Sequence, residues 1–155
     1  MVHGGWPPGG GGTDLGRTAS SKVTESLTKG GANAMDVGQG TANGLYQQAV
    51  AGPFRMERGA AERCAAVYTR LVETCLDQQV AATRRLMDLQ GFGGFDSSKE
   101  LQRGFFDKWL ATMEAVSGVR EAALRMAAAF LQAGGAFEEA DAMNRRALES
   151  VEVEQ

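Results

Sequence analysis

The residues whose chemistry could support catalysis or metal binding are few in this chain and lie far apart. The one histidine, His3, stands in a glycine- and proline-rich stretch near the start of the sequence. A histidine in such a stretch is not expected to be held in place by a fold. Serine–histidine and cysteine–histidine catalysis, and most transition-metal sites, therefore lack a positioned histidine. Glu138, Glu139 and Asp141 form a close acidic group, but a cation site would need further ligands from elsewhere. The sequence predicts no enzyme, no cofactor and no metal site.

The two cysteines are also predicted to be chemically quiet. Cys64 and Cys75 are about three helical turns apart, roughly 16 Å along a helix axis, which is beyond disulfide reach. Their spacing fits no zinc pattern. On a helix they share a face with Val67 and Leu71, so we expect two buried apolar thiols.

Composition and charge exclude several further classes of function. The net charge is -3 and its signs are interspersed, unlike the basic stripe of a nucleic-acid-binding protein. No apolar run approaches the roughly 18 residues that span a membrane, so no stable membrane insertion is expected. The glycines at 38, 40 and 44 lack the spacing of a dinucleotide fingerprint and the Gly-Lys-Ser/Thr ending of a phosphate loop. The first residues lack the basic start and apolar core of a general secretory signal.

A change in composition near residue 53 divides the chain. Most of the 21 glycines precede Phe54, whereas Ala, Leu, Met, Arg, Glu and Gln dominate after it. Residues 1–53 are predicted to be a flexible, largely disordered, glycine-rich arm, with possible short helices at Thr18–Lys29 and Asp36–Val50. Residues 54–150 are predicted to form a helical hairpin with a C-terminal signal segment.

The helical part is organised around one short turn. Gly91, Phe92, Gly93, Gly94 and Phe95 end one amphipathic stretch, and Ser97-x-x-Glu100 has the pattern of a capping box for the next. Phe92 and Phe95 are expected to act as apolar plugs. Apolar residues recur at steps of three and four on both sides of the turn. The first row is Phe54, Ala61, Cys64, Val67, Leu71, Cys75, Ala82, Leu86 and Leu89, and the second is Leu101, Phe105, Trp109, Met113, Val116, Val119, Ala123, Met126 and Phe130.

These rows predict an all-α fold, an antiparallel two-helix hairpin that forms half of a four-helix bundle. Two helices alone bury little apolar surface, so a homodimer or heterodimer with another helical hairpin is expected to cover the rest. The residues predicted at the helix interface are Leu71, Cys75, Leu86, Phe105, Trp109, Met113, Val116 and Phe130.

A further helical piece is expected after Gly134-Gly135, over Ala136–Leu148. It contains Phe137-x-x-x-Asp141, which places an aromatic ring and a carboxylate on one helical face. A receptor could fill a pocket with the ring and pair with the charge. Alternatively, Phe137 closes the core and Asp141 is merely solvated.

From Phe54 to Gln155 the chain resembles the Trp-x-Gly (ESAT-like) family of type VII secretion substrates, which are helical hairpins. The family carries an export signal, Tyr-x-x-x-Asp/Glu, after its second helix, and Phe137-x-x-x-Asp141 stands at that place. The surrounding segment is similar to the tails of actinobacterial relatives. The turn holds Phe92-Gly93-Gly94-Phe95 instead of Trp-x-Gly, and the first 53 residues have no counterpart in the minimal family.

The resemblance implies a non-enzymatic protein that acts through helix–helix interaction. It would be cytoplasmic before export, recognised by a secretion ATPase, and then secreted or held at the cell surface by a route other than the general secretory one. A cytosolic helical adaptor or scaffold unrelated to secretion remains the alternative.

Overall fold

The computed structural model describes residues 36–88 and 90–152, and within these ranges all regular structure is helical. Residues 36–51 form a first helix. After a connection come α2 (Arg58–Leu71), a π-helical turn (Val72–Leu76), α3 (Asp77–Arg85) and a 3-10 turn (Leu86–Asp88). The elements α4 (Asp96–Ala133) and α5 (Phe137–Glu152) complete the described chain. The possible helix at Thr18–Lys29, and Leu89 of the predicted first row, lie outside the described residues.

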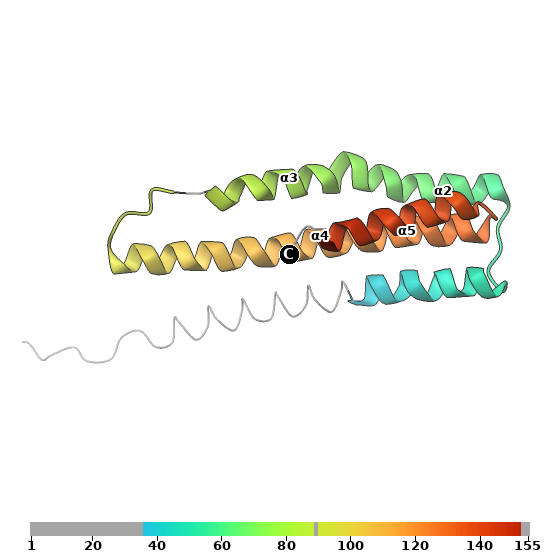
Figure 1. Ribbon diagram of the computed structural model, residues 1–155, viewed down its shortest axis with the longest axis horizontal. Helices are drawn as coiled ribbons and strands as arrows, with labels where there is room; N and C mark the ends of the chain where they lie inside the picture. The colour runs from blue at the N-terminus through green and yellow to red at the C-terminus, as the bar shows by residue number, and fades with distance from the viewer. Residues whose placement is uncertain (1–35, 89, 153–155) are drawn as a thin grey trace, which may run out of the picture.

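The long helix α4 is the axis of the molecule, and the other helices pack along it (Figure 1). It has 38 residues, which corresponds to about 57 Å. The α2–α3 rod runs antiparallel to α4 and joins it through the glycine-rich turn, so the all-α hairpin expected from the sequence is present. At the other end of α4, Gly135 turns the chain with a φ of 76°, and α5 runs back along α4.

The 36–51 helix makes the arrangement more than a hairpin. It lies along the C-terminal half of α4, where Gln39 Nε2 donates to Glu121 Oε2 over 3.1 Å. Arg125 Nη1 donates to Asn43 Oδ1 over 2.9 Å. Ala42 and Ala49 are buried. The helix expected at Asp36–Val50 thus forms and packs on α4, in contrast to the loosely ordered arm predicted for this part of the chain.

A side-chain cap explains where α2 begins. The carboxylate of Glu57 accepts hydrogen bonds from the amides of Gly59 and Ala60, both at 2.9 Å, and caps α2. These bonds also lower the pKa of Glu57 below its usual value.

The predicted capping box at the start of α4 does not form. This helix already begins at Asp96, and its N-cap, Phe95, makes no side-chain capping bond. The hydroxyl of Ser98 donates instead to the carbonyl of Phe95 over 2.6 Å. Because Ser97 already lies inside the helix, it is not at the position from which a serine caps.

The buried core consists largely of alanine, which allows the helix backbones to approach closely. One group of buried residues joins α2, α4 and the start of α5, and comprises Ala65, Ala127, Leu131, Ala136 and Ala140. A second lies further along and comprises Val72, Leu76, Ala123, Leu124 and Ala147. Tyr68 stacks on Phe130 with ring centroids 5.8 Å apart and links the two groups. The chain therefore covers the C-terminal half of α4 with its own helices.

The residues that α2 and α3 bury differ by one position from the row expected from the sequence. The expected core residues Val67 and Leu71 are 65% and 41% exposed, and Cys75 is also exposed. Ala61 is buried as expected, but from there on the inward row is Ala65, Tyr68, Val72, Leu76 and Thr83. Most steps from Ala61 along this row are four residues long. Four residues of an α-helix turn through about 400°, so each such step moves the row about 40° around the helix. The π-helical turn at Val72–Leu76, with its i→i+5 bonds, holds one more residue per turn and keeps Val72 and Leu76 against α4.

This register predicts unequal effects for two neighbouring truncations. Val72→Ala removes fully buried methyl groups and is expected to lower the free energy of unfolding by about 2 kcal/mol. Leu71→Ala removes more carbon from a half-exposed side chain and is expected to cost less than about 1 kcal/mol. Urea denaturation followed by circular dichroism measures both. A larger loss for Leu71→Ala would contradict the observed register.

Candidate functional site

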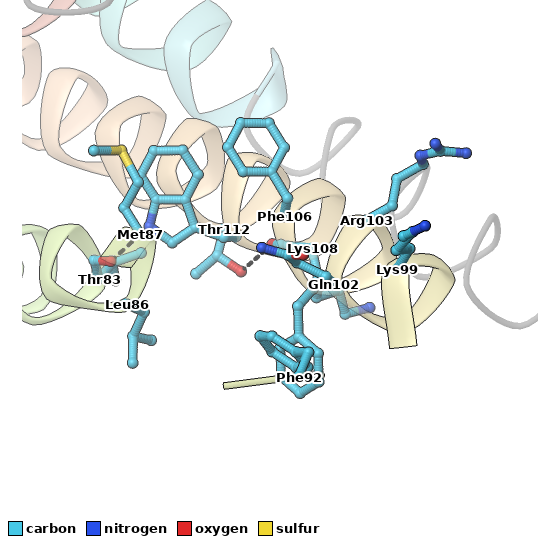
Figure 2. A pocket seen from close by; sticks show the side chains of 12 residues that line it. Thr83, Leu86, Met87, Phe92, Lys99, Gln102, Arg103, Phe106, Lys108 and Thr112 are labelled. Atoms are coloured by element: carbon cyan, nitrogen blue, oxygen red, sulfur yellow. Dashed lines mark hydrogen bonds between the residues drawn. The ribbon is translucent and has the colours of Figure 1, made fainter. Parts of the chain in front are cut away.

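A groove lies between α3 and α4 at the turn end of the hairpin. Its volume is about 680 Å³. Its lining residues come from the end of α3, the 3-10 turn, the glycine-rich turn and the N-terminal half of α4 (Figure 2). They are Thr83, Leu86, Met87, Phe92, Lys99, Gln102, Arg103, Phe105, Phe106, Lys108, Trp109 and Thr112. The groove is thus built where the two rods of the hairpin meet the turn.

The aromatic side chains of the groove are held by specific contacts. Trp109 Nε1 donates a 2.6 Å hydrogen bond to the carbonyl of Thr83, which ties α4 to α3. Its ring lies 5.5 Å from that of Phe106, between centroids. Across the groove, the ring of Phe92 lies 5.4 Å from that of Phe105. The floor of the groove is therefore aromatic and partly preorganised.

The turn that closes this end owes its shape to two glycines. Gly91 and Gly93 have φ values of 97° and 87°, which side-chain-bearing residues rarely adopt. They bring Phe92 back onto Phe105. Phe95, in contrast, is 80% exposed, so only Phe92 acts as the expected plug.

Every charged residue in the described lining of the groove is a cation. These cations are Lys99, Arg103 and Lys108. Lys99 has a partner at its outer edge, because its Nζ lies 3.4 Å from Asp96 Oδ1 and both side chains are well exposed. Among the described side chains no carboxylate lines the groove, so an apolar floor is combined with a basic rim.

One row of residues on α4 passes under α5 in the C-terminal half of the helix and lines the groove in the N-terminal half. Leu124 is fully buried in the cluster that contains Ala147 of α5, and Arg120 Nη1 donates to the Arg146 carbonyl over 3.4 Å. Toward the N-terminus of α4 the same row runs through Ser117, Met113, Leu110, Phe106, Arg103 and Lys99, at steps of three and four. Leu110 and Phe106 are 46% and 51% exposed. Within the described residues, therefore, the row loses its cover where α5 ends.

The residues predicted at the helix interface fall into three environments. Met113 is buried, and Val116 and Phe130 are half-buried, all on α4. Leu86, Phe105 and Trp109 line the groove, where Leu86 is 53% and Phe105 50% exposed. Leu71 and Cys75 point away from the core because of the register described above. Sequence reasoning missed Phe106, which stands next to Phe105 but outside the predicted row, and both rings line the groove.

The predicted signal residues lie on the outer side of α5. Phe137 is 59% exposed and Asp141 is exposed, one helical turn further on. The residue before each of them is buried instead: Ala136 and Ala140 pack against α4 and α2. Phe137 therefore does not close the core, which contradicts that part of the alternative, whereas Asp141 is exposed to solvent as the alternative expects. Glu139 accepts a 3.3 Å hydrogen bond from Arg58 Nη2 at the start of α2.

The remaining candidates for chemistry stay apart. Cys75 is exposed and Cys64 partly buried, and both are free thiols, so the expected burial of both thiols is wrong for Cys75. In the described ranges no three His, Cys, Asp or Glu residues gather in a way that could hold a metal ion. The helices of the described chain include none with the length and hydropathy needed to cross a membrane.

Comparisons with protein-family models, with curated proteins and with solved structures find no match for this chain.

Proposed function

We propose that this protein is a non-enzymatic helical-hairpin protein of the type VII secretion class that acts by binding a helical partner. Its export would depend on Phe137 and Asp141, read by the secretion ATPase in the cytoplasm before the protein leaves the cell. The partner, a second copy or another helical hairpin, would be bound at the groove end of the hairpin.

The observation that carries the export part of the proposal is the placement of Phe137 and Asp141. An aromatic side chain that is 59% exposed contributes little to the core, and it stands beside Ala136, which is 2% exposed. Since α5 is anchored through its alanine face, the outer face is free to present the ring and the carboxylate in a fixed geometry. Such a pair offers a receptor one apolar anchor and one charge.

The test is the double variant Phe137→Ala/Asp141→Ala, expressed in a bacterium with a type VII secretion apparatus. We expect export into the medium to fall at least about tenfold, because the receptor loses both anchors. Helix content and melting temperature should change little, since both side chains are exposed. Quantitative immunoblots of medium and cell fractions measure the effect.

A matched control on the same helix is Leu148→Ala/Glu149→Ala. Leu148 is 56% exposed and Glu149 is exposed as well, so the control also removes one apolar and one acidic surface group. Export of the control should stay within about twofold of the parent. Equal export of all three proteins would remove the signal assignment.

A cytosolic adaptor that binds a helical partner is the second candidate, and the apolar groove favours it as much as the first. Fractionation of the culture distinguishes them. A protein that stays in the cells of a secretion-competent host, while its partner binding persists, would be an adaptor. Genes for secretion ATPase components beside its own would favour export.

A further inference from the structure

We propose that the groove at the turn end of the hairpin binds an acidic amphipathic helix of a partner protein, laid along α4 in line with α5. The proposal deepens the partner-binding part of the proposed function and rests on it. The site consists of the apolar residues Phe92, Phe105, Phe106 and Trp109 and the cations Lys99, Arg103 and Lys108.

The site is open because α5 packs on the C-terminal half of α4 and does not reach its N-terminal half. At Arg120 and Leu124, α5 lies on the row of α4 that ends at Lys99: Arg120 Nη1 donates to the Arg146 carbonyl, and Leu124 is fully buried in the cluster that contains Ala147. Toward Lys99 the same row exposes Phe106 and Leu110. Apolar side chains at steps of three and four along an open helical row match the anchors of a helix that binds in a groove. A bound helix would extend the packing that α5 begins.

The charge of the site selects the kind of helix. Lys99, Arg103 and Lys108 line the groove, and no carboxylate does so among the side chains that the structure describes. Arg103 and Lys108 have no ion-pair partner among the described residues. Glutamate or aspartate beside the apolar stripe of a bound helix would pair with them. Such complementarity sets the choice of partner and speeds association.

Two other occupants fit the charge less well. A second copy that docked groove to groove would place the same three cations against each other, which like-charge contacts disfavour. The first 35 residues of this chain carry Arg17, Lys22 and Lys29 against Asp14 and Glu25, so they bring no acidic excess to a basic rim. An acidic helix from another protein is the occupant that the charges favour.

The experiment measures binding of a fluorescein-labelled peptide to the full chain by fluorescence anisotropy. The peptide is an amphipathic helix of about 18 residues, with leucines at helical spacing and glutamates along both flanks. A second peptide replaces every glutamate with lysine. We expect a dissociation constant on the order of 10 µM for the acidic peptide and at least about tenfold weaker binding for the basic one. Added salt should weaken the acidic complex.

Two triple variants locate the site. Lys99→Glu/Arg103→Glu/Lys108→Glu should lower the affinity for the acidic peptide at least about tenfold. Arg63→Glu/Arg70→Glu/Arg145→Glu changes the net charge equally at exposed positions outside the groove, and should alter the affinity less than about twofold. Circular dichroism establishes that both variants keep the parent helix content.

Every other outcome overturns the proposal. Equal affinity for both peptides, or an equal loss of affinity in both triple variants, would show that the groove does not select an acidic helix. Dimers that the groove variant abolishes would assign the groove to a second copy. Binding of dodecyl sulfate below its micelle concentration, with no peptide binding, would assign it to an anionic amphiphile. If the acidic peptide does not bind but export is normal, only the groove proposal is wrong. If the protein is not exported but the peptide binds, only the export proposal is wrong.

Discussion

Truncation of Leu124 is expected to lower the free energy of unfolding by about 3 to 5 kcal/mol in the Leu124→Ala variant. Leu124 is fully buried, in one cluster with Val72 of α2–α3 and Ala147 of α5. Removal of its side chain loses apolar burial and leaves a cavity between three helices, which the alanine-rich surroundings cannot fill. Urea unfolding followed by circular dichroism measures the loss.

The control for this prediction is Leu101→Ala on the same helix. Leu101 is 55% exposed and does not line the groove, so the same chemical change should cost less than about 1 kcal/mol. Two variants of similar stability would contradict the position of the core in the C-terminal half of α4.

A methyl group at Gly134 is expected to destabilise the protein by about 1 to 3 kcal/mol in Gly134→Ala. A Cβ atom built there would stand 2.4 Å from the Cβ of Ala61, well inside the contact distance of two carbons, about 3.5–4.0 Å. The φ of Gly134 is -86°, which alanine adopts readily, so the cost is purely steric. Ala61 is fully buried on α2, and relief requires α2 to move away from α4.

Gly104 offers the matched control, because it lies inside α4 with open space around it. Gly104→Ala should stabilise the protein by about 0.5 to 1 kcal/mol through helix propensity. When Ala61→Gly is added to the Gly134→Ala variant, it should restore at least half of the lost stability, because it removes the methyl group that faces the new one. A Gly134→Ala variant as stable as the parent would show that α2 does not approach the end of α4 closely.

The breaks between the helices were predictable because glycines set them locally, although the capping box predicted at the start of α4 does not form. Gly91 and Gly93 break the chain between α3 and α4 through their positive φ values, and Gly134-Gly135 separates α4 from α5. Residues 137–152 form the helical piece expected after them. Signals of this kind act within a few residues and do not depend on the packing partner.

The register of the first rod was not predictable in the same way. Leu71 and Val72 belong to neighbouring rows that both repeat at helical spacing, and spacing alone led us to predict the row of Leu71 and Cys75. The structure buries the row of Val72 and Leu76 instead, because small residues such as Ala65 let α2 approach α4. Periodicity alone does not choose between adjacent rows when alanine forms the interface.

The candidate site was predictable only in part. Trp109 and Phe105 were expected to contact another helix, and they do line the side of α4 that faces α3. The open groove depends on where α5 ends and on the position of the 36–51 helix, and both follow from long-range packing. The adjacent pair Phe105-Phe106 was the one local signal, because it gives α4 apolar surface on more than one side.

Residue-resolved amide hydrogen exchange on the full chain tests the central claim most directly. The claim is that the described helices cover the C-terminal half of α4 and leave its N-terminal half open. We expect amides of residues 123–133 to exchange only on global unfolding, and those of residues 99–110 to exchange at least about a hundredfold faster through local opening. Uniform protection along the whole of α4 would contradict the claim, because it would mean that the groove end is already covered.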